Sequence, residues 1–432
     1  MPPQSNRSKQ RFPLIRREIA GLPVADLVRD FGTPTYVYDA ARIEQRIRDL
    51  APFDTVRYAQ KANSNLAILD LCRRNGVLVD AVSAGEIHRA LRAGYGTEGT
   101  PPPIVYTADI FDEDALELVV RHRIPVNCGS PDMVEQYGKR VSGGEITLRI
   151  NPGFGHGHSQ KTNTGGEQSK HGIWYEDLGD CLDLAKKSGL RVTGIHTHIG
   201  SGADMEHLAM VSKAVVSFAR QVGPDIHTLS AGGGLPIQYR EEDPAIDIAA
   251  YYRIWDRERK ELAAEFGHPV RLEIEPGRFL TAESGYLISE IRAIKRMGKN
   301  LFYVLDAGFN NLARPILYGA YHPMSIAPCD DGGRERPLQD VIVGGPLCES
   351  GDIFTQDEGG IVRAQRLPQA SVGEHLIIEC AGAYGFVMGS NYNSKTLAAE
   401  VLIAEGTAHL VRERQSIEDL FRGESIPPRA ED

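Results

Sequence analysis

The sequence lacks any run of about 18 consecutive apolar residues, so it predicts no transmembrane helix. Residues 1–18 are basic but contain no apolar core, so they do not predict a secretory signal. Positive charge is in deficit overall, because 48 lysines and arginines stand against 58 aspartates and glutamates, for a formal charge of −10. A protein this acidic has no bulk attraction for phosphate backbones or anionic lipid. We therefore expect neither nucleic acid nor a membrane as a partner.

Cysteine is also scarce, and its spacing predicts no metal site. The six residues show no CxxC pair and no zinc-finger spacing; they are Cys72, Cys128, Cys181, Cys329, Cys348 and Cys380. Scattered cysteines in a long chain without a signal are typical of free thiols in a reducing cytoplasm. We expect a cytoplasmic protein in which five of the six are small buried apolar residues, the exception being Cys348.

The chain has 432 residues, enough for two domains with sizeable cores. Short β-rich runs alternate with helix-like stretches such as SNLAILDLCRRN through most of its first two thirds. The runs are 55–60, 77–82, 103–108, 124–128, 145–150, 191–198, 226–230 and 270–275. Eight such units over roughly 250 residues predict an α/β fold, a closed (β/α)8 barrel with parallel strands. An open, doubly wound sheet is the competing fold.

The pattern changes after residue 295. Short alternating runs such as LFYVLDAG, DVIVGG and HLIIECAG are separated there by glycine, proline and aspartate clusters. This pattern predicts a mostly antiparallel β domain, a β-barrel or sandwich. We place the barrel at residues 37–285 and the β domain at 1–36 and 286–432, where it would complete the active site.

Polar or glycine-rich sequence follows almost every predicted barrel strand. The segments are QKANSN, DAVSAGE, NPGFGHGH, HTHIGSG, SAGGG and IEPGR. In a (β/α)8 barrel the carboxyl ends of all strands open on one face, which carries the active site. Six polar ends are hard to attribute to turns alone, so we expect the functional residues there.

Two of these ends suggest a phosphate cradle. SAGGGLP (230–236) has three consecutive glycines, and without Cβ atoms their N–H groups can approach an anion closely. HIGSG (198–202), one strand earlier, adds the hydroxyl of Ser201. Barrels often bind phosphate after their late strands. A tight turn between strand and helix is the alternative explanation for the glycines.

Other strand ends supply groups for a flat, charged ring. Glu275 ends an apolar strand and needs a partner, which is either Arg278 or a protonated ring nitrogen. His196 and His198 alternate along the sixth strand, so we expect one to face the interior of the barrel and the other to face the helices. The interior histidine is either a structural residue or stacked on a ring. Lys61 in VRYAQKANSN follows an apolar strand as either a solvated terminus or a reactive amine. Together these groups describe pyridoxal phosphate held as a Schiff base.

The sequence also resembles a known family. The segments that carry the resemblance are YAQKANSN, NPGFGHGHSQKTNTGGEQSKHGIW, HTHIGSG, GGG, EPGRF, ARPILYGAYH, GPLCESGD and GAYGFVMGSNYN. In order and spacing, from about residue 20 to 420, they resemble the diaminopimelate decarboxylase family of alanine-racemase-like, fold-type III pyridoxal-phosphate decarboxylases. The resemblance implies decarboxylation of meso-2,6-diaminopimelate to L-lysine and CO2, the last step of lysine biosynthesis.

The resemblance implies a role for each matched residue. Lys61 matches the Schiff-base lysine, His198 the histidine stacked on the ring, and Cys348 the proton donor; these are the expected catalytic residues. Glu275 matches the partner of the pyridine nitrogen, and Glu349 the residue that binds the distal amino group of the substrate. The other matched cofactor positions are Asp80, Ser201, Gly233, Gly234, Gly277, Arg278 and Tyr384, and the other matched substrate positions are Arg278, Arg314, Tyr318 and Tyr384.

In this family CESGD (348–352) comes from the second subunit, so the resemblance implies a homodimer with shared active sites. The chain departs from the family at Ala381, where threonine is usual, and at Lys395 and Thr396, where Arg-Pro is usual. These departures leave open a paralogue that acts on another diamino acid, such as ornithine, lysine or arginine. An amino-acid racemase, which would need a catalytic tyrosine, and a single-barrel pyridoxal-phosphate-binding protein without catalysis are further alternatives.

Overall fold

The computed structural model describes residues 11–155, 165–198, 204–329 and 336–428. The chain divides into two compact units, Ala40–Glu283 and a second unit made of the two ends of the chain, Met1–Asp39 and Ser284–Asp432. Residues 37–39 and 284–285, which the sequence pattern assigns to the barrel, lie instead in the second unit. Residues 37–39 belong to β3 (Thr35–Asp39), which pairs with β13 (Gly285–Met297) and β21 (Ala399–Ala404) of that unit.

The unit Ala40–Glu283 is a closed barrel of eight parallel strands. In pairing order the strands are β4 (Thr55–Ala59), β5 (Leu78–Ala81), β6 (Ile104–Ala108), β7 (Val126–Cys128), β8 (Glu145–Asn151), β10 (Arg191–His196), β11 (Thr228–Ser230) and β12 (Arg271–Ile274). β12 pairs with β4 and closes the ring. The prediction of a (β/α)8 barrel is confirmed, and the open sheet is excluded. A short strand, β9 (Ile173–Trp174), pairs with β8 beyond the barrel.

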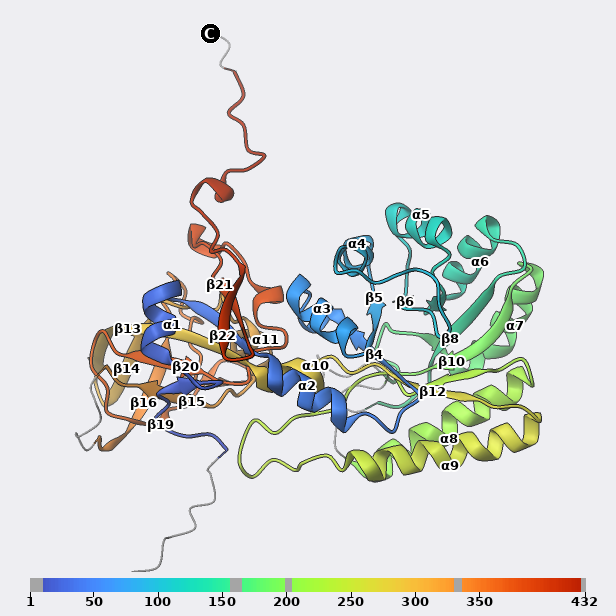
Figure 1. The fold of residues 1–432 in the computed structure, drawn as a ribbon, viewed down its shortest axis with the longest axis horizontal. Coiled ribbons are helices and arrows are strands. Elements are labelled where there is room, and N and C mark those ends of the chain that lie inside the picture. Colours follow the sequence, from blue (N-terminus) through green and yellow to red (C-terminus); the bar gives the residue numbers. More distant parts are fainter. Residues whose placement is uncertain (1–10, 156–164, 199–203, 330–335, 429–432) are drawn as a thin grey trace, which may run out of the picture. The chain divides into compact units, whose positions relative to one another are not determined.

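Helices lie outside the ring of strands (Figure 1). They are α2 (Ala40–Asp49), α3 (Leu66–Arg74), α4 (Ala84–Arg92), α5 (Glu113–His122), α6 (Pro131–Arg140), α7 (Leu178–Lys187), α8 (Met205–Val222), α9 (Ile248–Phe266) and α10 (Arg278–Thr281). Asn65, Ser83 and Ser130 cap α3, α4 and α6, each accepting a hydrogen bond from a backbone N–H of the first turn. These caps end the loops that follow β4, β5 and β7. Within the described ranges, no helix is long and apolar enough to cross a membrane.

The second unit is built on a sheet in the order β19-β16-β14-β13-β3-β21-β22, with β20 on β13 and β15 on β20. Its remaining strands are β14 (Asn300–Leu305), β15 (Met324–Ala327), β16 (Leu338–Gly344), β19 (Gln365–Pro368), β20 (His375–Ile378) and β22 (Thr407–Arg412). Only the β14–β16 and β3–β21 pairs in this sheet are parallel among the described strands, so the prediction of a mostly antiparallel domain is confirmed.

Short elements complete this unit. They are β1 (Glu18–Ile19), β2 (Leu22–Pro23), α1 (Val24–Phe31), α11 (Arg314–Tyr318), β17 (Gln356–Asp357) and β18 (Ile361–Val362). Helix α1 buries Val24 and Leu27 in a cluster that also contains Val37, Ile288 and Val401. That cluster joins α1 to β3, β13 and β21, which explains why this N-terminal helix folds with strands from the C-terminal part of the chain.

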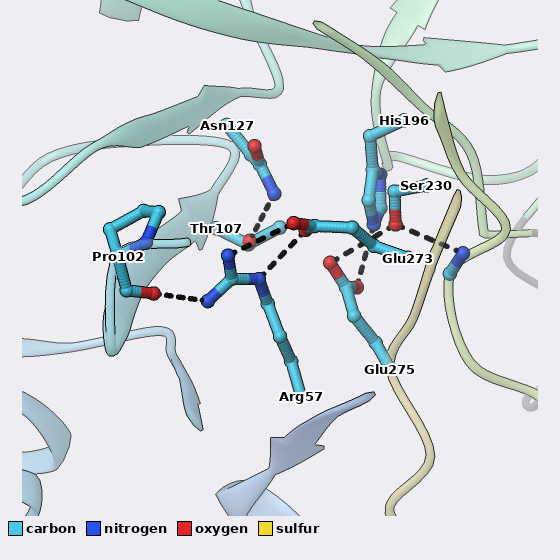
Figure 2. A network of polar contacts seen from close by, with 9 residues as sticks. Arg57, Pro102, Thr107, Asn127, His196, Ser230, Glu273 and Glu275 are labelled. Atoms are coloured by element: carbon cyan, nitrogen blue, oxygen red, sulfur yellow. Dashed lines mark hydrogen bonds and ion pairs between the residues drawn. The ribbon is translucent and has the colours of Figure 1, made fainter. Parts of the chain in front are cut away.

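A buried ion pair spans the first and last strands of the barrel (Figure 2). Arg57 on β4 is 1% exposed and Glu273 on β12 is 6% exposed. The guanidinium binds the carboxylate twice, with Nε–Oε2 at 2.8 Å and Nη2–Oε1 at 3.1 Å. Arg57 Nη1 also donates to the carbonyl of Pro102 at 2.7 Å. Since an unpaired buried charge is costly, each partner makes the burial of the other tolerable.

Replacing Arg57 with methionine leaves Glu273 buried without its partner, which costs about 3–5 kcal/mol. We expect the melting temperature of Arg57→Met to fall by roughly 10 °C in scanning calorimetry. The double variant Arg57→Met/Glu273→Leu should regain most of this loss, because it also removes the stranded charge.

The matched control is Arg121→Met on α5, because Arg121 pairs with Glu117 at the surface, where the two side chains are 59% and 53% exposed. This variant should shift the melting temperature by no more than about 2 °C. If Arg57→Met melts at the same temperature as the control, the barrel does not depend on the buried pair.

Candidate active site

Lys61 lies in a one-turn 3-10 helix, Gln60–Ala62, directly after β4. It is exposed and lines a cavity of about 1040 Å³ that is also lined by Thr107, Asp109, Arg149 and His171. The EPGR segment (275–278) packs closely against this turn, since a Cβ on Gly277 would lie 3.1 Å from the carbonyl oxygen of Ala59. The amine therefore opens on a cavity at the carboxyl ends of the strands, on the face where barrels carry their active sites.

Glu275 follows β12 and is bound by a side chain of β10 and a side chain of β11 (Figure 2). Its Oε2 lies 2.7 Å from Nε2 of His196, and its Oε1 accepts a hydrogen bond from the hydroxyl of Ser230 at 3.3 Å. Arg278, one of the two partners that we considered, instead donates to the hydroxyl of Tyr239 at 2.9 Å. The predicted pairing of Glu275 with Arg278 is therefore wrong, and its protein partners are His196 and Ser230.

The surroundings of Glu275 keep its carboxylate ionised. Burial alone would raise its pKa, but the charge and hydrogen bond of His196, with the charges of Arg57 and Arg149, lower the pKa below its usual value. A negative charge is thus held inside the barrel at neutral pH. Such a group suits a protonated ring nitrogen.

The pKa of Asp80 on β5 shifts in the opposite direction. Burial, and then the charge of Glu275, raise its pKa well above the usual value, while the hydroxyl of Thr107 and the charge of Lys61 oppose the rise. Thr107 Oγ1 accepts from Nδ2 of Asn127 at 2.8 Å, so its own proton is available to Asp80. The Oδ1 atom of Asp80 is buried and has no hydrogen-bond partner among the described residues.

The two histidines of HTHIG do not divide between the interior and the helices. Strand β10 ends at His196, which contacts Glu275 inside the barrel. His198 lies two residues further, and its Nδ1 accepts a hydrogen bond from the N–H of Gly233 at 2.9 Å. The prediction that one of them faces the helices is wrong, since residues two apart on a strand share a face and the strand stops before His198.

His198 is a neutral ring at neutral pH. Burial lowers its pKa well below the usual value, and the positive charges of Lys61 and Arg149 lower it further. A neutral imidazole is consistent with Nδ1 acting as an acceptor, because that nitrogen then carries a lone pair and Nε2 carries the proton.

Close packing explains two of the three glycines in SAGGG. A Cβ on Gly232 would lie 2.0 Å from the carbonyl oxygen of Thr197, and one on Gly233 would lie 2.5 Å from that of Glu275. Gly234 has a φ of +92°, which favours glycine. The turn thus brings backbone against the ends of β10 and β12. Ser201, the other predicted member of the cradle, lies outside the described residues.

The structure adds a histidine–aspartate pair that the sequence analysis missed. His171 Nδ1 lies 2.6 Å from Oδ2 of Asp109, whose Oδ1 accepts from the N–H of Gly172 at 2.9 Å. Burial opposes ionisation of Asp109, but the hydrogen bond from His171 and the charge of Arg149 outweigh it and lower its pKa. Both residues line the cavity with Lys61. The sequence signal for this pair is the KHGIW segment (170–174), which contains His171 and also carries the family resemblance.

The remaining predicted residues lie in the second unit. Arg314 is buried at the start of α11, and Tyr318 ends the same helix. Cys348 and Glu349 are exposed, and the Cys348 N–H donates to Oδ1 of Asn393 at 2.6 Å. Tyr384 has a φ of +55°, a strained value for a residue with a side chain.

All six cysteines are free thiols. Four are buried, as predicted, namely Cys72, Cys128, Cys181 and Cys380. The prediction of burial is wrong for Cys329, which lies exposed just beyond β15, where the chain leaves the sheet.

Four groups of the barrel fit pyridoxal phosphate. They are the amine of Lys61, the ionised carboxylate of Glu275, the neutral ring of His198 and the buried Oδ1 of Asp80, which has no hydrogen-bond partner among the described residues. Lys61 and Glu275 both act on the pKa of Asp80, so these groups share one region of the barrel. Residues 40–282 match the family described as "Pyridoxal-dependent decarboxylase, pyridoxal binding domain". That match covers the whole barrel, so pyridoxal phosphate is the cofactor of this fold.

Curated relatives and solved structures identify one family among the pyridoxal-dependent decarboxylases. The chain is 52% identical over 396 residues to diaminopimelate decarboxylase of Escherichia coli K12, covering 91% of this chain and 94% of the relative. It is 49% identical over 425 residues to that of Streptomyces coelicolor, covering 98% and 96%. A crystal structure of diaminopimelate decarboxylase has a TM-score of 0.90 at 50% identity, covering 95% of this chain and 98% of that one. The Helicobacter pylori enzyme complexed with L-lysine has a TM-score of 0.82 at 30% identity, covering 92% and 98%. Agreement at this level across nearly the whole chain shows that it belongs to the diaminopimelate decarboxylase family of pyridoxal-dependent decarboxylases.

Proposed function

We propose that this protein is a carboxy-lyase that converts meso-2,6-diaminopimelate to L-lysine and CO2, the last step of lysine biosynthesis. The observation that carries the proposal is the buried, ionised Glu275 in the same region of the barrel as Lys61. Relatives about half identical to this chain are diaminopimelate decarboxylases, which favours this substrate over another diamino acid.

Bound pyridoxal phosphate supplies an electron sink for the pair left when CO2 departs from the substrate. In our proposal Lys61 holds the cofactor through its amine, and Glu275 keeps the proton on the ring nitrogen. His198 would help to hold the flat ring of the cofactor, because an uncharged imidazole can stack on it without repelling the ring's positive charge. Asp80, Ser201, Gly233, Gly234, Gly277, Arg278 and Tyr384 complete the proposed cofactor site.

Recognition of the substrate requires a cation for its distal carboxylate and an anion for its distal ammonium. We assign the first role to Arg314, with Arg278, Tyr318 and Tyr384 as further substrate contacts, because guanidinium matches a carboxylate with two parallel hydrogen bonds. Glu349 binds the ammonium. Cys348 donates the proton that replaces CO2 at Cα, since a thiol is a competent acid at neutral pH.

We further propose a cytoplasmic homodimer in which each CESGD segment (348–352) serves the active site of the other subunit. The exposure of Cys348 and Glu349 supports this proposal, because neither side chain is buried within its own chain. In this arrangement the β domain completes the active site. The free thiols agree with a reducing compartment.

Lys61→Ala should lose both the visible absorbance of bound pyridoxal phosphate and the release of CO2 from meso-diaminopimelate, because the covalent attachment is gone. Absorbance spectra of the purified protein and a coupled L-lysine assay measure the two effects. Lys139→Ala, which removes an exposed lysine of α6, should retain both. An alanine variant at position 61 that still releases CO2 at the normal rate would exclude this lysine as the attachment site.

Glu275→Gln should lower kcat by about 100-fold or more, because it removes the charge that holds the ring proton. The lowered pKa of Glu275 determines the pH range over which its charge contributes to kcat. The group is ionised above its depressed pKa, so its contribution persists through neutral pH and disappears only on acidification below the usual glutamate range.

The assay is kcat against pH for the wild type, Glu275→Gln and Ser230→Ala. The last variant removes the longer contact of Glu275, at 3.3 Å, together with the hydrogen bond that Ser230 accepts from the N–H of Gly232 at 3.2 Å. Because it leaves the charge of Glu275 in place, it should lower kcat far less than the glutamine variant. A glutamine variant with the kcat of the wild type would contradict the proposed electrostatic role.

Glu349→Ala should raise KM for meso-diaminopimelate roughly tenfold or more, because a hydrogen bond to a charged group is lost. Steady-state kinetics measure the change. The matched control is Glu358→Ala, at an exposed glutamate of the same unit, which should leave KM unaltered. Full activity of Glu349→Ala at low substrate concentration would rule out the binding of the distal amine by this residue.

A further inference from the structure

His322 bridges Arg314 to the sheet of the second unit. It lies between α11 and β15 and is 0% exposed. Its Nε2 is 2.8 Å from Nη1 of Arg314, and its Nδ1 is 2.9 Å from the backbone carbonyl oxygen of Glu379. The imidazole therefore stands between a guanidinium and a fixed backbone atom.

The two partners determine where the ring carries its proton. A carbonyl oxygen only accepts hydrogen bonds, so Nδ1 must donate to Glu379. A guanidinium only donates, so Nε2 must accept from Arg314 with its lone pair. Both contacts are satisfied by a single form of His322, the neutral tautomer protonated at Nδ1.

The carbonyl that anchors His322 is itself held firmly. Glu379 directly follows β20, and its N–H donates to the carbonyl of Pro323 at 2.9 Å. Its carboxylate accepts two hydrogen bonds from Arg16, both at 2.9 Å, and one from Ser325 at 2.9 Å. Gln365 donates to the backbone carbonyl of His322 at 3.3 Å. The histidine is thus fixed at both its backbone and its ring.

Arg314 needs such support, because it begins a helix of only five residues and is 6% exposed. An acidic partner would orient the guanidinium but would also neutralise it at close range. A neutral imidazole orients Nη1 and leaves the positive charge in place. That charge is the property required to bind a carboxylate.

We propose that His322 is a positioning residue for substrate recognition: anchored on the carbonyl of Glu379, it sets the orientation of Arg314 toward the distal carboxylate of the substrate. This inference rests on the proposed function, in which Arg314 binds that carboxylate. His322 does not touch the reacting atoms in this proposal, so it should govern affinity for the substrate and the product rather than the chemical step.

Two isosteric substitutions separate the ring's two contacts. Glutamine places an oxygen near the position of Nε2, so His322→Gln keeps the acceptor for Arg314. Asparagine places an amide N–H near the position of Nδ1, so His322→Asn keeps the bond to Glu379 but removes the acceptor for Arg314. A role in anchoring the backbone alone predicts the opposite ranking of the two variants.

The experiment measures the L-lysine dissociation constant of the holoenzyme by calorimetry, together with KM and kcat for meso-diaminopimelate. L-Lysine retains one of the substrate's carboxylates, so it reports on Arg314 without turnover. His322→Asn should raise the dissociation constant and KM about tenfold or more while kcat stays within about threefold. His322→Gln should leave all three within about threefold of the wild type.

Arg314→Met separates failure of this inference from failure of the proposed function. If Arg314→Met binds L-lysine as the wild type does, the proposed role of Arg314 is wrong. If Arg314→Met loses binding but His322→Asn keeps it, or if the glutamine variant is the weaker binder, the positioning role of His322 is wrong. Melting temperatures of the two His322 variants show whether a loss of affinity follows from a loss of folding.

Discussion

The carboxyl end of the barrel depends on one carboxylate that stays ionised where water is largely excluded. Glu275 is 4% exposed, and burial on its own favours the neutral acid. His196, at 2.7 Å, and the more distant charges of Arg57 and Arg149 reverse that preference. The negative charge of Glu275 is therefore maintained by residues of four strands, β4, β8, β10 and β12, which carry or lead into these side chains.

The same charge shapes its neighbourhood. Burial raises the pKa of Asp80 and the charge of Glu275 raises it further, so the pKa values of these two buried acids shift in opposite directions. Divergent pKa values of this kind divide acid and base roles between chemically similar groups. The positive charge of Arg57 is neutralised at close range by Glu273, and this ion pair also joins the first and last strands of the barrel. The ionisation of Glu275 and the closure of the barrel thus use the same arginine.

Sequence patterns predicted the barrel because each strand is a short apolar run that stops at polar or glycine-rich residues. They did not predict which sheet β3 joins, since Thr35–Asp39 precedes the barrel directly but pairs with strands more than 240 residues further along the chain. The partner of Glu275 was misjudged for a similar reason. Arg278 is near in sequence, whereas His196, 79 residues away, is near in space because β10 and β12 both border β11. Contacts of His322 with Arg314 and Glu379 were equally out of reach, because they depend on how a loop lies against β20.

The most direct test of this account is the ionisation state of Glu275 itself. Infrared difference spectra between the wild type and Glu275→Gln, recorded on the apoenzyme from pH 3 to pH 8, isolate the carboxyl band of this residue. The account predicts a carboxylate band at pH 7 that gives way to the protonated acid only below the usual glutamate range. A protonated acid band at pH 7 would contradict it.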